Sequence, residues 1–107
     1  MEIKYCKPKT IYDCIYLTKE NYKEVVRMVI KDNDGFEVSE EAFESAKILE
    51  YRDTKERILE IEYSQFRHSV WFFFDSWYVR PYDEYGKKGY WMNWSNEEFA
   101  KLYELVN

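Results

Sequence analysis

The residue types that carry most enzyme chemistry are few in this sequence. His68 is its only histidine, and Cys6 and Cys14 are its only cysteines. A general base or an activated nucleophile needs a partner at a recognisable spacing, and none of the Ser, Cys or His residues stands in such a motif. The three glycines form no loop that could hold a phosphate. We therefore expect no enzyme activity, and we interpret His68 as a polar residue at a strand edge.

A calcium loop is the metal motif that the spacing partly matches. Asp32, Asp34, Gly35 and Glu41 occupy its third, fifth, sixth and twelfth positions, but Ile30 stands at the first position, where such loops need a carboxylate. The cysteines and the histidine also lack the paired spacing of a zinc site. We therefore expect no metal and no cofactor, and we interpret the segment 32–35 as the end of a helix.

Both cysteines are expected to be reduced. The segment between Cys6 and Cys14 is predicted to be a strand, which would hold their Cα atoms farther apart than the roughly 4.4 to 6.8 Å of a disulfide. We expect the two thiols to be buried or inert.

Aromatic residues are concentrated in one part of the chain. Twelve of the 29 residues from Phe66 to Trp94 are aromatic. Because aromatic side chains dominate small cores, we expect most of them inside, with Trp71, Phe73 and Trp77 among these. Twelve cannot all be buried in a domain of this size, so some must lie at the surface.

Three tyrosines are candidate contacts for a partner, because they lie in or beside a polar loop. A surface tyrosine often serves as a rigid anchor in an interface. Tyrosines also stack on nucleobases, but few Lys or Arg residues stand nearby to bind phosphates, which disfavours nucleic acid. The three residues are Tyr82, Tyr85 and Tyr90.

The middle of the chain carries the negative charge. Residues 32–62 hold eleven Asp/Glu and four Lys/Arg, a net of −7 in a protein of net charge −5. Such a segment is either a solvated face or a surface that attracts a basic partner. We predict a basic protein surface as the partner and expect no direct binding to nucleic acid. The predicted acidic contacts are Glu37, Glu40, Glu41 and Glu44.

Hydrophobic periodicity predicts the elements that position these residues. A strand is expected from Pro8 to Leu17, and an amphipathic helix follows Thr18 as its N-cap. The later elements are a short helix from Ser39 to about Lys47, a hairpin at 48–51 and 57–63, two strands within 70–79 around an Asp75-Ser76 turn, a loop at 81–88 and a strand at 89–94.

A last helix is expected after Ser95, which forms a capping box with Glu98. Its apolar stripe should dock through Phe99, Leu102, Tyr103 and Val106. At 107 residues the chain fits one domain, 1–107, of the α+β class. We expect an antiparallel sheet of about four to six strands, with two main amphipathic helices and one short helix packed on one face.

Both ends of the chain carry a recognisable order of elements. The sequence KPKTIYDCIYLTKENYKEVVRMV opens with Lys-Pro, a strand and an amphipathic helix, and DSWYVRPYDEYGKKGYWMNWSNEEFAKLYELV closes with a Trp strand, a loop, an aromatic strand and a helix. This order resembles a loose family of small phage and prophage proteins of uncharacterised role. The similarity covers roughly residues 7–30 and 75–106, and Asp75-Ser76 replaces the Gly-Asp usual before the Trp strand.

The resemblance implies an accessory protein of a mobile element. Small acidic proteins of that setting are often inhibitors of bacterial defence, including anti-CRISPR proteins. The expected function is therefore stoichiometric inhibition of a defence system by protein binding. The alternatives are a module that sequesters a nucleotide or signalling molecule, and an immunity or structural protein of a mobile element.

The setting also implies a location. No apolar run approaches the roughly 20 residues needed to cross a bilayer, and no secretory leader opens the sequence. We expect a cytoplasmic protein in a bacterial host, with no membrane contact, as a monomer or a homodimer.

Overall fold

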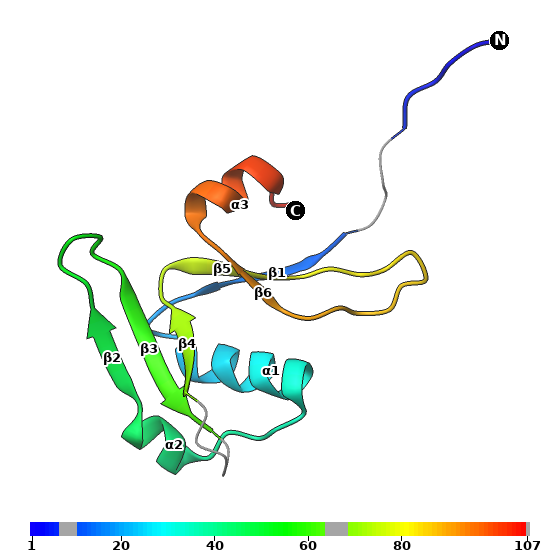
Figure 1. Ribbon diagram of the computed structural model, residues 1–107. Coiled ribbons are helices and arrows are strands. Elements are labelled where there is room, and N and C mark those ends of the chain that lie inside the picture. Colours follow the sequence, from blue (N-terminus) through cyan, green and yellow to red (C-terminus); the bar gives the residue numbers. More distant parts are fainter. Residues whose placement is uncertain (7–10, 64–68, 107) are drawn as a thin grey trace.

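The computed structural model describes residues 1–6, 11–63 and 69–106. In these ranges the chain forms two antiparallel three-stranded sheets and three helices (Figure 1), which confirms the expected α+β class. In chain order the elements are β1 (Asp13–Leu17), α1 (Tyr22–Asp34), α2 (Glu40–Ser45), β2 (Lys47–Glu50), β3 (Arg57–Glu62), β4 (Ser69–Phe73), β5 (Ser76–Arg80), β6 (Met92–Trp94) and α3 (Asn96–Leu102).

The strands divide between two sheets, so the prediction of a single sheet is wrong. The first sheet has the order β1-β5-β6 and the second the order β2-β3-β4. The division occurs at the corner between β4 and β5, where Asp75 adopts a positive φ of 55°. The amide of Phe74 donates to the carbonyl of Arg57 at 3.0 Å, and the next amide, that of Asp75, donates to Leu17 at 2.7 Å. Consecutive residues therefore bind different sheets, and the chain crosses over instead of forming a hairpin.

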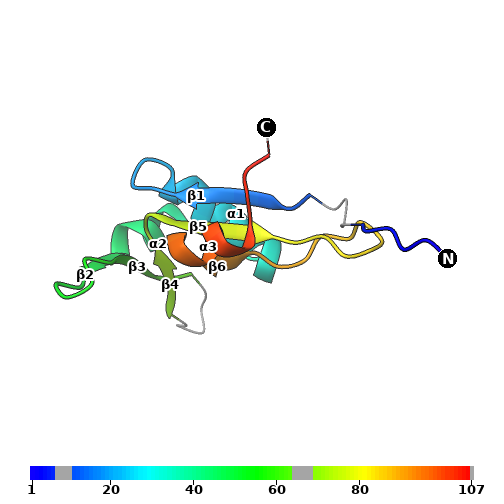
Figure 2. The ribbon, with the colours of Figure 1, turned by 90° about the horizontal axis from the view of Figure 1, so that it is seen from above.

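The two longer helices lie on opposite sides of the first sheet (Figures 1 and 2), which corrects the expectation that all helices share one face. Side chains alternate along β5, so Tyr78 joins the main core while its neighbour Trp77 stacks on Phe99 of α3. Both faces of this sheet are apolar, and each therefore needs a helix to cover it.

Helix α1 supplies one wall of the main core. Its four buried residues fall on one stripe at i, i+1, i+4 and i+5, as an amphipathic helix requires, namely Val25, Val26, Val29 and Ile30. They pack against side chains of the second sheet, including Leu59, Ile61 and Phe72. None of the described helices is both long and apolar enough to cross a membrane.

The ends of α1 differ from the prediction in detail. The N-cap position is Asn21, not Thr18, and the two residues cap each other: the Thr18 amide donates to Asn21 Oδ1 at 2.7 Å, and the Asn21 amide donates to Thr18 Oγ1 at 3.3 Å. The helix runs through Asp34. It ends at Gly35, whose φ of 75° places it in the left-handed region that glycine tolerates.

The segment from α2 to β3 follows the predicted order. Ser39 caps α2 by accepting a hydrogen bond from the Ala42 amide, and the helix ends at Ser45, slightly earlier than expected. The predicted hairpin is present as β2 and β3, and its register pairs Ile48 with Leu59. Strands β1 and β6 begin later than expected, at residues 13 and 92; Pro8 itself lies outside the described residues.

The capping box at the start of α3 is confirmed, but the predicted docking stripe is only half right. Ser95 and Glu98 exchange side-chain and backbone hydrogen bonds. Phe99 is buried, and its ring lies 4.1 Å from that of Trp77. Leu102, the last residue of the helix, is 60% exposed. Val106 is 68% exposed, because the chain leaves the helix at Tyr103 and the helical spacing no longer applies to it.

The cap and the anchor of α3 should contribute unequally to stability. We expect Ser95→Ala to lower the free energy of unfolding by about 0.5 to 2 kcal/mol and Phe99→Ala by about 3 to 5 kcal/mol. Leu102→Ala, at an exposed position of the same helix, is the matched control and should change it by less than about 0.5 kcal/mol. Urea unfolding measures all three, and equal small losses at Ser95 and Phe99 would contradict the described packing.

Candidate functional site

Tyr82, one of the predicted contacts, is tied into an internal cluster around Arg80. Its hydroxyl donates to Asp13 Oδ2 at 2.6 Å, and Arg80 binds the same carboxylate through Nε at 3.1 Å. Arg80 also donates to Asp32 at 2.9 Å, and its guanidinium lies 4.7 Å from the ring of Trp91. Tyr82 therefore holds β1 to the start of the loop, and its hydroxyl is engaged inside the protein.

The other two predicted tyrosines lie on the hairpin that this cluster supports. Tyr85 is 87% exposed and Tyr90 is 69% exposed. The hairpin is held by Asp83, whose carboxylate accepts the amides of Tyr85 and Lys87 at 2.9 and 2.8 Å. Two aromatic side chains thus stand on an ordered support at the surface.

Two of the predicted acidic contacts form ion pairs within the protein. Glu40 binds Lys23 at 2.9 Å and Arg27 at 2.7 Å, which fastens α2 to α1, and these two cations lower the pKa of its carboxyl, Lys23 first. Glu37 lies 3.4 Å from Lys31. All three pairs are solvent-exposed and contribute little to stability, but they neutralise part of the predicted acidic face.

Glu41 and Glu44 remain available for a partner. Both are exposed, and neither forms an ion pair with another of the described residues. They lie on α2, whereas the tyrosine hairpin lies at the other end of the molecule (Figure 1). The structure therefore does not bring the predicted acidic and aromatic contacts together.

The second sheet presents an aromatic surface that the sequence pattern did not reveal. Residues 58, 71 and 73 point away from the core because their neighbours Leu59 and Phe72 point into it. They line a hollow of about 350 Å³, which we call the outer-face strip, together with residue 51. Its residues are Tyr51, Ile58, Trp71 and Phe73.

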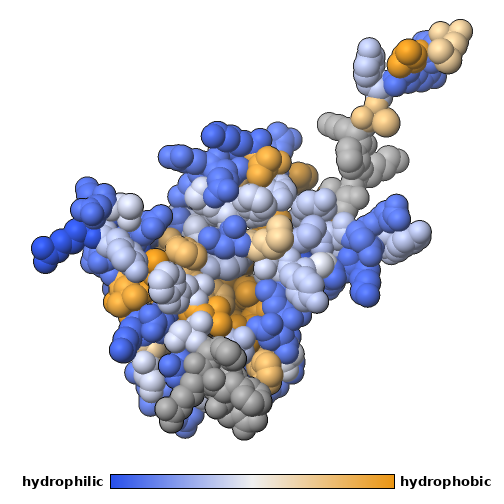
Figure 3. Space-filling model, viewed as in Figure 1, coloured by the Kyte–Doolittle hydropathy of each residue, from blue (hydrophilic) through white to orange (hydrophobic). Residues whose placement is uncertain are grey.

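Exposure in this strip corrects one prediction. Trp71 was expected in the core, yet it is 48% exposed, and Tyr51 is 43% exposed beside it. Phe73 and Trp77 are half-buried. Figure 3 shows apolar side chains gathered over the second sheet on this side of the molecule, bordered by hydrophilic ones. A half-exposed Trp beside the buried side chain of Ile58 is typical of the centre of a protein interface, where aromatic residues are enriched and charged residues are rare.

Carboxylates border the outer-face strip on two sides. Glu60 is paired across the sheet with Trp71 and Lys47, and Glu62 follows it on the same face. On the other side the strip continues past Phe73 into a groove of about 560 Å³ between the β2–β3 turn and the start of α3. Glu56 and Glu97 line that groove. The border of the strip therefore carries several carboxylates, with Lys47 beside Glu60 and with Arg52 and Arg57 lining the two hollows.

Both cysteines lie within the described part of the chain. Cys6 and Cys14 are free and exposed, so of the two expected alternatives, buried or inert, the structure rules out burial. Desolvation raises the pKa of the Cys14 thiol, and the negative charge of Asp13 raises it further. The thiol is therefore protonated at neutral pH. His68 lies outside the described residues. Within 1–6, 11–63 and 69–106, no three His, Cys, Asp or Glu side chains are grouped to hold a metal ion.

The two aspartates of the calcium-like spacing have other roles. Asp32 accepts from Arg80 and from the Trp91 indole, and Asp34 accepts the hydroxyl of Tyr63 at 2.6 Å. Burial and then this hydrogen bond raise the pKa of Tyr63 to about 12.

Comparison with known proteins adds no relative. No family model matches the chain, and neither the curated proteins nor the solved structures contain a significant match.

The hydrogen bond from Tyr82 should be visible in the titration of Asp13. The Tyr82 hydroxyl and then Arg80 hold the pKa of Asp13 below its ordinary range. A lowered pKa in the folded state adds stability above the unfolded value of about 3.9, and that stability is lost as the pH falls through the folded value. We expect Tyr82→Phe to raise the pKa of Asp13, measured by carboxyl NMR, while Tyr85→Phe leaves it unchanged. An ordinary pKa for Asp13 in the unmodified protein would contradict the cluster.

Proposed function

We propose that this protein acts by binding a basic surface of another protein through the outer-face strip and the carboxylates that border it. The observation that carries the proposal is the half-exposed pair Trp71 and Tyr51 over buried Ile58, set beside Glu56 and Glu60. Aromatic residues of this kind contribute most of the affinity at interface centres, and the surrounding charges select the partner and speed the encounter.

The size of the strip indicates how much more of the protein must take part. Three strands about 4.8 Å apart and about five residues long cover a plane of roughly 250 Å². A stable interface needs about 800 Å² from each partner. The neighbouring groove beside α3 and the free carboxylates Glu41 and Glu44 of α2 are the additions that the proposal requires.

For the partner, we propose a nucleic-acid-binding effector of a bacterial defence system, inhibited stoichiometrically. Two arguments support this choice: the net charge of −7 in residues 32–62, which matches a groove built for phosphates, and the resemblance of both chain ends to small phage proteins. In this mechanism the carboxylates bind the Lys and Arg side chains of the effector that would otherwise bind the phosphates of the nucleic acid.

The tyrosine hairpin is the alternative anchor. Tyr85 and Tyr90 are exposed on a loop that hydrogen bonds to Asp83 keep ordered, so little entropy would be lost on binding. Since the hairpin and the second sheet lie apart, single substitutions distinguish the two surfaces (Figure 1).

The anchor can be identified with the partner captured from a bacterial host by the tagged protein. We expect Trp71→Ala to weaken binding by at least about 2 kcal/mol, or roughly 30-fold, mainly through faster dissociation. Tyr85→Ala and Tyr90→Ala are the matched comparisons and should change the affinity less than three-fold. Surface plasmon resonance measures all three, and a reversed order would move the anchor to the hairpin.

The role of charge is tested by reversing the free carboxylates. Glu41→Lys with Glu44→Lys leaves the structural pairs of Glu40 intact, and we expect it to slow association by about three- to ten-fold at low salt and to flatten the salt dependence. Glu2→Lys with Glu20→Lys makes the same change in net charge at exposed positions outside the middle segment and outside the tyrosine hairpin. If both double variants slow association equally, only the net charge matters and the acidic surface is a solvated face.

A further inference from the structure

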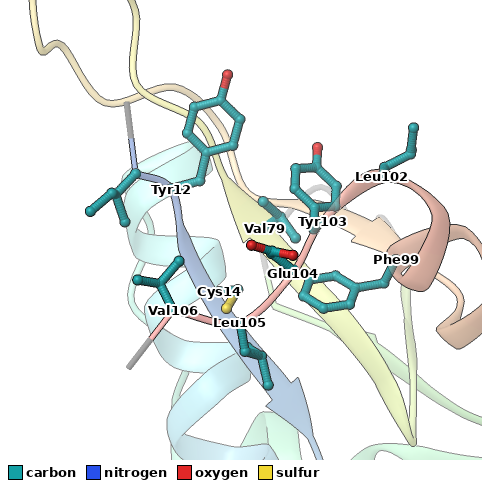
Figure 4. Close-up of a pocket in the computed structure, with 10 residues that line it drawn as sticks. Tyr12, Cys14, Val79, Phe99, Leu102, Tyr103, Glu104, Leu105 and Val106 are labelled. Atoms are coloured by element: carbon teal, nitrogen blue, oxygen red, sulfur yellow. The ribbon is translucent and has the colours of Figure 1, made fainter. Parts of the chain in front are cut away.

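A second hollow lies on the first sheet, on the side that carries α3, and it is independent of the surface described above. It is a groove of about 360 Å³ between β1 and the segment that follows α3 (Figure 4). Its floor includes Val79 and Cys14, and its rim includes Ile11, Leu105 and Val106, which are 60% to 68% exposed. The groove is therefore apolar and open to solvent.

One exposed carboxylate belongs to the lining of this apolar groove. Glu104 is the one charged side chain among the described residues that line it, and its carboxylate lies among Cys14, Val79 and Tyr103 in the close-up (Figure 4). The thiol beside it is uncharged, because desolvation raises the pKa of Cys14. Because Glu104 is exposed, its attraction for a cation is that of a surface carboxylate, and the apolar side chains beside it must supply the rest of the affinity.

Two tyrosine rings border the same place. Tyr12 comes from the strand side and Tyr103 from the end of α3, and their ring centroids are 6.1 Å apart with the planes inclined at 59°. The Tyr103 ring is fixed by contacts with Trp94 and Phe99 at 6.1 and 5.4 Å. Aromatic rings next to a carboxylate are the surroundings in which proteins bind ammonium groups.

We propose that this groove binds a lysine side chain of a partner protein, with the ammonium group at Glu104 between the two tyrosines. The four methylene groups of lysine match the apolar length of the groove along Leu105 and Val106, which a small inorganic cation would leave unfilled. Charge complementarity thus selects the occupant.

The test uses the whole protein and a small probe, so it does not depend on the proposed function. Amide NMR spectra are recorded during titration with Nα-acetyl-lysine methylamide and, separately, with the norleucine analogue that lacks the ammonium group. We expect lysine to shift the amides of Cys14, Tyr103 and Glu104 with a Kd on the order of 1 mM, as a ligand of about 14 heavy atoms would give. The norleucine probe should bind at least five-fold more weakly.

Two substitutions separate charge from aromatic contact. Glu104→Gln and Tyr12→Leu should each weaken lysine binding by about three- to ten-fold, whereas Glu20→Gln, an exposed carboxylate outside the groove, should not change it. Equal binding of the two probes, or equal effects of Glu104→Gln and Glu20→Gln, would overturn the proposal. Choline binding more tightly than lysine at the same amides would overturn the assignment to a protein side chain in favour of a small quaternary ammonium ligand.

Discussion

The contact on which much of this structure depends is the double ion pair of Arg80 with Asp13 and Asp32. Only 13% of the Arg80 side chain is exposed, so the loss of either carboxylate would leave a cation partly desolvated and poorly paired. The cluster joins β1, β5 and α1, and through Tyr82 and Trp91 it also holds both ends of the hairpin between β5 and β6. Asn33 strengthens this by exchanging two hydrogen bonds with the backbone of Trp91, at 2.8 and 3.1 Å. The hairpin is ordered because its base is fixed.

A second constraint comes from the corner at Phe74 and Asp75. Because the two amides bind different sheets, β4 and β5 cannot pair, and each sheet keeps a face of its own. The first sheet is covered on both sides, by α1 and by α3 (Figures 1 and 2). The second sheet has α1 against its inner face, and the aromatic side chains of its outer face remain partly in solvent. The surface proposed for binding is therefore a consequence of how the chain turns this corner.

The two proposed binding places use different physics. The outer-face strip combines large aromatic area with scattered carboxylates, which suits a broad protein surface. The groove at Glu104 is small and has one exposed carboxylate beside apolar side chains, which suits a single side chain. Both favour cationic partners, in keeping with the net charge of −5. Neither place requires chemistry from the thiols, since the raised pKa of Cys14 keeps it in its unreactive form.

The sequence by itself determined the local features: the stripe of α1, the capping box of Ser95 and Glu98, the cap at Ser39 and the glycine exit at Gly35. Each of these depends on residues within one or two helical turns of each other, so spacing and residue type suffice. Only the tertiary structure decided that the strands form two sheets, that Trp71 is exposed and that the hydroxyl of Tyr82 is engaged by Asp13, 69 residues away in the chain. Alternation along a strand shows which residues share a face, but not which face is covered. Which face is covered depends on how distant segments pair. The free energy of each possible pairing is set by contacts between residues far apart in the sequence, which no local pattern contains.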